Sequence, residues 1–162
     1  TDTAARDQHK LLKDIGVEPL GNGFHVDHMV EKLRDKKAPM KAALLDQHVV
    51  AGLGNIYVSE ALFRARISPT LEAGKLVKKK GPDARLEHLV RHVRDILNEA
   101  IRVGGSTLQD FQGTHGETGA FQERFLVYDR EGEPCTTPGC TSVVKRITQS
   151  GRSTFYCPTC QK

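Results

Sequence analysis

Acidic residues are missing from the last part of the sequence, and cysteine is missing from everything before it. No Asp or Glu occurs between Pro134 and Lys162, and no Cys occurs before position 135. The chain also has no apolar run of membrane length, no signal-peptide pattern and no internal repeat or low-complexity tract. These absences argue against a membrane-spanning protein, a secreted protein and a repeat architecture, respectively.

The composition is that of a soluble protein with clustered positive charge. The 162 residues suffice for one ordinary domain with a small satellite, 38% are hydrophobic, and the mean hydropathy is −0.44. The net charge of +4 is modest, but the basic residues gather in three groups, which favours nucleic acid as a partner over a merely solvated face. The groups are Lys32, Arg34, Lys36, Lys37 and Lys41; Arg64, Arg66, Lys75, Lys78, Lys79 and Lys80; and Lys145, Arg146, Arg152 and Lys162.

The four cysteines form two close pairs, Cys135 with Cys140 and Cys157 with Cys160. Paired thiolates at such separations can surround one tetrahedral Zn²⁺ with a structural role, and a segment this small has little core of its own. The stretch between the pairs alternates, turns at Ser150-Gly151 and alternates again, which predicts a β-hairpin with Arg152 at its tip. Two disulfides are the alternative, and the absence of secretion signals favours zinc.

Before the cysteines, the pattern is mainly helical. Apolar spacing predicts helices over residues 26–36, from Pro39 to about Asp46, from an Asn55 N-cap to about residue 66, and from about residue 84 to Gly104-Gly105. The last helix carries an apolar stripe that we expect to be core: Leu86, Leu89, Val90, Val93, Ile96, Leu97, Ala100 and Ile101. Residues 106–120 are predicted to form a long functional loop, and residues 121–129 a strand.

A phosphate-binding site is predicted where the second and third helices meet. Gly52 and Gly54 permit a tight double turn in which the backbone can approach a ligand closely, and Asn55 stands at the start of the next helix. The free N–H groups and the positive dipole end of that helix favour an anion, and Lys41 adds charge. We expect Asn55 to cap the helix and to offer its amide to a phosphate oxygen. The histidines are scattered and indicate no catalytic site.

Two longer strings carry a family resemblance. MKAALLDQHVVAGLGNIYVSEALFRARISP resembles the helix–two-turn–helix (H2TH) core of the Fpg/Nei DNA glycosylases, and GRSTFYCPTCQK resembles the zinc finger of the formamidopyrimidine branch, Fpg. The resemblance implies excision of oxidised purines, such as 8-oxoguanine and formamidopyrimidines, followed by β,δ-elimination at the abasic site. It implies DNA contacts at Lys36, Lys37, Lys41, Gly54, Asn55, Tyr57 and Arg152. It also makes Arg152 the proton donor for δ-elimination, and residues 106–125 a loop that caps the lesion.

The resemblance also sets the expected domain plan and its gaps. The fold class is mainly α, with a connector at 1–25, an H2TH domain at 26–105, the loop at 106–125 and a zinc finger at 126–162. The family's N-terminal β-sandwich, with its proline nucleophile in a PELPE-like start, has no match here. The chain begins TDTAARD, so we expect a fragment of a longer bifunctional glycosylase that is inactive alone.

Two alternative functions remain open: a Nei-type glycosylase for oxidised pyrimidines, and a stand-alone nucleic-acid-binding module. The loop at 106–125 favours the Fpg branch over the Nei branch. In either enzyme branch we expect a monomer that binds double-stranded DNA carrying oxidised bases or abasic sites. We expect no membrane partner, and a bacterial-type cytoplasmic location with the nucleoid.

Overall fold

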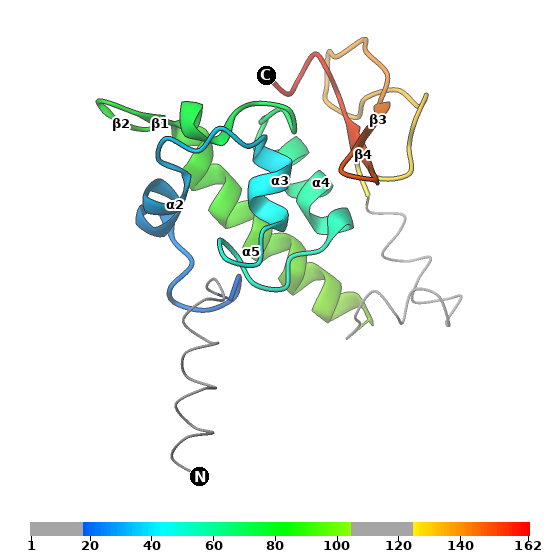
Figure 1. Cartoon of the computed structure of the whole chain (residues 1–162). Helices are drawn as coiled ribbons and strands as arrows, with labels where there is room; N and C mark the ends of the chain where they lie inside the picture. Colours follow the sequence, from blue (N-terminus) through cyan, green and yellow to red (C-terminus); the bar gives the residue numbers. More distant parts are fainter. Residues whose placement is uncertain (1–17, 105–124) are drawn as a thin grey trace.

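The computed structural model describes residues 18–104 and 125–162. A helical domain is followed by a small β-hairpin finger that lies against one side of it (Figure 1). Most of the expected connector and almost all of the expected lesion-capping loop therefore lie outside the described residues. None of the described helices is long and apolar enough to cross a bilayer.

The first three helices of the domain follow the predicted order with shifted ends. Helix α2 spans Val26–Leu33, shorter than expected, because the chain reverses at Asp35, which has a positive φ of 56°. Helix α3 spans Met40–Leu45 after Pro39, which takes the N-cap position and not the first turn. Its buried apolar face and its end at Asp46 are as predicted.

Helix α4 spans Asn55–Arg64, and here one prediction was wrong. Gly54 is the N-cap, with extended backbone, and Asn55 is the first helical residue. The Asn55 side chain therefore does not cap the helix. Most of α4 is buried, because it runs through the middle of the domain between α3 and α5 (Figure 1).

A short 3-10 helix and a small hairpin lead into the longest helix. The 3-10 helix η1 spans Ala73–Leu76, and strands β1 (Val77–Lys78) and β2 (Gly81–Pro82) pair antiparallel. Helix α5 spans Ala84–Gly104. The Asp83 carboxylate accepts the Arg85 backbone N–H at 2.9 Å, so it caps the first turn of α5.

The apolar stripe of α5 forms one wall of the main core. Leu86, Leu89, Val93 and Ile96 are almost completely buried against side chains of α2, α3 and α4. Ile101 is the exception, since it is 53% exposed. It lies in the last turn of α5, where apolar spacing alone does not decide whether another element covers the helix.

The finger contains the predicted hairpin. Strands β3 (Lys145–Gln149) and β4 (Arg152–Tyr156) pair antiparallel, with Gln149 opposite Arg152. The two residues between them, Ser150 and Gly151, both have positive φ, at 51° and 78°. This is the backbone of a type I′ turn, which matches the twist of a two-residue hairpin.

The strand expected at 121–129 is absent from its described part. Residues 125–129 form bends and turns, and Asp129 has a positive φ of 61°. Their backbone N–H groups are bound by a side chain instead of a neighbouring strand. The Glu60 carboxylate accepts the N–H groups of Leu126, Val127 and Tyr128 at 2.8, 2.9 and 3.0 Å.

The helical domain and the finger share a core. Phe63 of α4 packs with Val127, Val144 and Phe155 of the finger and with its buried cysteines. Polar contacts cross the same interface: the Gln161 amide donates to the Ile67 carbonyl at 2.9 Å, and other pairs join Arg85 to Lys162, Arg66 to Thr137 and Gln149 to Pro69. The finger is thus held at several points and has one orientation.

Candidate nucleic-acid interface

The four cysteine sulfurs converge at the base of the finger. All four lie within 4.8 Å of one another, and none is in a disulfide. The sulfurs of Cys135 and Cys160 are 3.8 Å apart, and those of Cys140 and Cys157 are 3.7 Å apart. Four thiolates placed tetrahedrally at about 2.3 Å from Zn²⁺ lie about 3.8 Å from each other. The residues fit one structural zinc.

Contacts outside the four ligands fix the site and connect it to the helical domain. The Cys157 backbone N–H donates to the Gln161 side chain at 2.8 Å, and the Cys160 N–H points at the Cys157 sulfur at 3.5 Å. Gln161 is buried and also reaches the Ile67 carbonyl, as described above. Zinc bound by the four cysteines would therefore help to order the segment that carries the hairpin against the helices.

Strand β4 of the finger contacts α3 and the start of α4 in the helical domain. The Lys41 ammonium donates to the Ser153 carbonyl at 3.1 Å and to the Thr154 hydroxyl at 2.5 Å. The Asn55 amide donates to the same Ser153 carbonyl at 3.1 Å. These contacts join residues about 100 positions apart, and they hold Arg152, which immediately precedes Ser153, beside the start of α4.

Lys41 is the most unusual charge at this junction. Its side chain is only 1% exposed. Burial, and then the positive charge of Arg152 nearby, lower the pKa of Lys41 from 10.5 to about 8. The ammonium thus lies near one other positive charge, Arg152, with little water around it.

A cavity of about 430 Å³ opens at the same place. It is lined from one side by α3 and the double turn, including Asp46, Gln47 and Leu53, and from the other by Gln149, Ser150 and Arg152 of the hairpin tip. Arg152 is exposed, so its guanidinium is available to a ligand in this cavity.

Asp46 organises the double turn beside the cavity. Its carboxylate accepts the His48 N–H at 2.9 Å, and its carbonyl accepts the Val49 N–H at 2.9 Å. The hydrogen bond from the His48 backbone is the main reason that the pKa of Asp46 lies below its usual range. Gln47 closes the turn by accepting the Gly52 N–H at 2.6 Å, and Gly52 needs its glycine because its φ is 75°.

The structure brings some of the predicted DNA contacts together and buries others. Arg152, Asn55 and Lys41 converge, but Lys41 is itself buried and bonded to the finger. Tyr57 is 8% exposed and lies in the helical core, where burial raises the pKa of its hydroxyl. Gly54 is the N-cap of α4 and offers no side chain to the first turn.

Lys36 and Lys37 lie on the loop between α2 and α3. Lys37 is exposed, and Lys36 is partly buried. The Lys36 ammonium lies 3.7 Å from the Asp46 carboxylate. Lys36 is therefore connected to the cavity through Asp46, whereas Lys37 faces solvent.

Sequence reasoning missed the residues that hold the site in place. Glu60, Asp46, Gln47 and Gln149 contact backbone groups or side chains of the junction, and none stands in a pattern that indicates this role. Only Glu60 carried a signal: it is a carboxylate in the mostly apolar sequence of α4, next to Ala61 and Leu62. A buried carboxylate needs donors, so it predicts a partner without saying which one.

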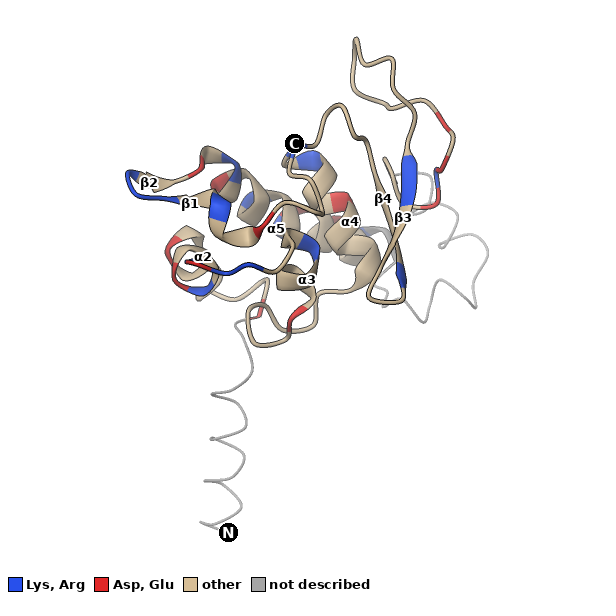
Figure 2. Ribbon diagram, turned by 45° about the horizontal axis from the view of Figure 1, so that its top comes forward, with Lys and Arg blue, Asp and Glu red and all other residues tan. Residues whose placement is uncertain are grey.

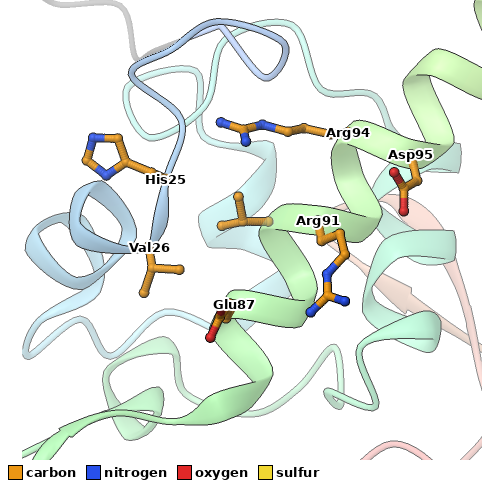
Figure 3. A pocket seen from close by; sticks show the side chains of 7 residues that line it. His25, Val26, Glu87, Arg91, Arg94 and Asp95 are labelled. Atoms are coloured by element: carbon orange, nitrogen blue, oxygen red, sulfur yellow. The ribbon is translucent and has the colours of Figure 1, made fainter.

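A second cavity, of about 300 Å³, lies between α2 and α5 (Figure 3). Its lining mixes Arg91 and Arg94 with Glu87 and Asp95. Arg94 is already engaged, because its guanidinium donates to the Phe24 carbonyl and stacks over the Phe24 ring at 5.9 Å. No residue predicted as a site lines this cavity.

Comparison with known protein families identifies the family of this chain. Residues 15–112 match the model of the formamidopyrimidine-DNA glycosylase H2TH domain, and residues 132–162 match that of the zinc finger found in FPG and IleRS. The chain belongs to the formamidopyrimidine-DNA glycosylase family, of which it contains the H2TH domain and the zinc finger.

Curated relatives agree with this assignment. The formamidopyrimidine-DNA glycosylase of Ruegeria sp. (strain TM1040) is 55% identical over 161 residues, which is 99% of this chain and 55% of the relative. The same enzyme of Nitrobacter winogradskyi is 59% identical over 152 residues, 93% of this chain and 52% of the relative. The chain spans about half the length of the curated relatives it matches.

Solved structures show the same fold. The MutM (Fpg) protein from Thermus thermophilus has a TM-score of 0.76 at 43% identity, covering 94% of this chain and 55% of that one. Lactococcus lactis Fpg in complex with DNA containing an abasic site has a TM-score of 0.80 at 36% identity, covering 100% of this chain and 56% of that one.

Proposed function

We propose that this chain is the DNA-gripping part of a bifunctional DNA glycosylase and AP lyase that acts on oxidised purines. The observation that carries the proposal is that Lys41 and Asn55 meet at the Ser153 carbonyl, next to Arg152, which lines an open cavity. The names of the relatives support the Fpg branch over the Nei branch. Complexes of related proteins with damaged DNA support a duplex as the ligand.

Each converging residue has a distinct role in this proposal. The N-terminal end of α4 and the Asn55 amide, which has a second N–H beyond the one given to Ser153, bind a backbone phosphate. The exposed Arg152 reaches the lesion and donates the proton for δ-elimination in the complete enzyme. Lys36 and Lys37 contact neighbouring phosphates. Lys41 acts by raising the local potential and by holding the Ser153 carbonyl.

Residues 1–25 connect to the preceding part of the enzyme, 26–105 form the DNA-gripping helical domain, and 126–162 form the finger. Residues 106–125 cap the lesion. The Schiff base forms on the amine of an N-terminal proline, for which residues 1–162 offer no matching motif, so these residues alone excise no base.

The affinity of variants for a DNA duplex tests the proposed DNA contacts of Asn55 and Arg152. Asn55→Asp keeps the shape of the side chain but replaces a donor by a negative charge, and Arg152→Ala removes the exposed guanidinium. Each should weaken binding to a duplex with an abasic-site analogue by about 1–3 kcal/mol, since charge-assisted bonds are lost. Arg91→Ala, an exposed arginine on α5, is the control for charge alone. Binding equal to the parent in both test variants would refute the assigned grip.

Borohydride trapping tests the catalytic part. Residues 1–162 should form no covalent adduct with a lesion duplex, whereas a chain extended by a proline-initiated N-terminal domain should. In the extended chain, Arg152→Ala should impair strand cleavage after β-elimination more than it impairs adduct formation. An efficient adduct with residues 1–162 alone would show that the nucleophile lies within them.

A further inference from the structure

Two basic segments that are far apart in sequence form one continuous edge of the helical domain. The loop between α2 and α3 carries Lys36 and Lys37, and η1 with the β1–β2 hairpin carries Lys75, Lys78, Lys79 and Lys80. Figure 2 shows blue on both segments. We call this edge, made of these six lysines, the lysine edge.

Backbone contacts join the two segments directly. The Gly74 N–H donates to the Lys36 carbonyl at 2.8 Å, and the Ala73 N–H donates to the Ala38 carbonyl at 2.9 Å. A Cβ at position 74 would lie 3.0 Å from both the nitrogen and the oxygen of Lys36, so this close approach depends on glycine. The two lysine-bearing segments therefore have a fixed spatial relation.

The hairpin presents its charge on a rigid base. Ala73 and Leu76 are fully buried in the main core, and the Asp83 N–H closes the hairpin by donating to the Leu76 carbonyl at 2.8 Å. Lys79 and Lys80 form the two-residue tip and are exposed. A protruding tip of this kind adds nothing to the core, so its lysines do not stabilise the fold by packing.

The charges at the tip are not neutralised. Lys78 pairs with Asp83 at 3.3 Å, and Asp83 also binds Arg85. Within the described residues, Lys75, Lys79 and Lys80 have no acidic partner. Repulsion among them in a fixed geometry is relieved when a polyanion binds, because the lysines take the place of counterions condensed on its phosphates.

The lysine edge also adjoins the proposed DNA-binding cavity beside Arg152. Lys36 contacts Asp46, and Asp46 lines the same cavity as Arg152. The lysine edge therefore begins beside the cavity, at Lys36. We propose that the β1–β2 hairpin is a second DNA contact, which binds the phosphate backbone of the duplex outside the lesion site without reading sequence. This inference rests on the proposed function.

The test compares two double variants of equal charge. Lys79→Ala/Lys80→Ala removes the charge of the hairpin tip, and Arg91→Ala/Arg102→Ala removes two exposed charges from α5. Affinities of the zinc-loaded chain are measured against salt for lesion duplexes from about 8 to about 26 base pairs long, or roughly 27 to 88 Å. Lys78 is left in place because its ion pair with Asp83 supports the hairpin.

The expected result depends on duplex length. On the longest duplex, the tip variant should lose about 1.8 from the slope of log K against log salt, and up to roughly 60-fold in affinity at about 0.1 M salt. On the shortest duplex it should bind like the parent, and the α5 variant should bind like the parent on every duplex. Hydroxyl-radical footprints should lose protection only outside the lesion.

Three results would overturn the proposal. If the tip variant bound the longest duplex like the parent, Lys79 and Lys80 would be solvent-exposed residues that do not contact DNA. An equal loss on every duplex would place their effect at the lesion and not on flanking DNA. An equal loss of affinity in the α5 variant would show that net charge, and not the position of the lysines, causes the weaker binding. Failure of the parent to bind any duplex would refute the proposed function itself, which is a distinguishable outcome.

Discussion

Replacing Glu60 by alanine should loosen the segment that leads into the finger. The Glu60 carboxylate is 1% exposed and accepts three backbone N–H groups, from Leu126, Val127 and Tyr128. The Arg64 guanidinium lies 3.7 Å away, and its side chain is partly buried. Alanine would leave these three donors without their acceptor, in a segment that is buried at Val127 and partly buried at Leu126 and Tyr128.

The size of the effect follows from the number of bonds and from what can relax. One hydrogen bond to a charged group contributes about 1.5–3 kcal/mol, and three would sum to about 4.5–9 kcal/mol if they were independent. They share one carboxylate and one short segment, which can turn toward water, so the sum is not additive. We expect the free energy of unfolding to fall by about 3–5 kcal/mol, the range for removing one partner of a buried charge pair.

Glu60→Gln should cost less, because one amide oxygen still accepts while the NH₂ group faces the remaining donors. Glu31→Ala, at an exposed position of α2, is the matched control and should change stability by less than about 0.5 kcal/mol.

Urea denaturation of the zinc-loaded chain measures the loss, and NMR hydrogen exchange at the amides of 126–128 locates it. The zinc content should be unchanged, because Glu60 contacts none of the cysteines. Full exchange protection of these three amides in Glu60→Ala would refute the reasoning.

Further predictions concern zinc and pH. Chelation of zinc should unfold the finger and weaken duplex binding, because Arg152 is no longer held beside the cavity. Far-ultraviolet circular dichroism should keep the helical signal, because the main core contains no zinc ligand. Hydrogen bonds from Arg85 lower the pKa of Asp83 to about 2. The contribution of Asp83 to stability is therefore present above about pH 4 and is lost as the pH falls through 2. The difference in unfolding free energy between the parent and Asp83→Asn should vanish over this range. Burial lowers the pKa of Lys41 from 10.5 to about 8, so between these pH values the unfolded chain binds more protons than the folded chain. The free energy of unfolding of the parent should therefore rise with pH in that window, and that of Lys41→Met should not.

The sequence by itself determined the elements with strong local signals. The apolar periodicity of α5 predicted a core helix because a stripe of that length can be satisfied only by burial. Ser150-Gly151 predicted the turn because glycine readily adopts the positive φ that hairpin turns need. The structure has positive φ at both residues. The cysteine spacing predicted the metal site because four ligands of one kind in two close pairs have few other uses.

Local signals were less reliable at the ends of elements. Asn55 is a frequent N-cap residue, but Gly54 takes that position, and the Asn55 amide is used by Ser153 across the junction. Ile101 continues the apolar spacing of α5 but is exposed, because none of the described elements covers the last turn. In both cases the missing information was the position of another segment.

Only the tertiary structure decided how the finger and the helices make one site. That Lys41 and Asn55 meet at the Ser153 carbonyl, or that Glu60 binds the backbone at 126–128, depends on contacts about 65 to 115 positions apart. Such contacts leave no periodic trace, because each is one polar group meeting another after the chain has folded. The residue types indicated that partners were needed, and the packing of the finger onto α4 determined which partners they found.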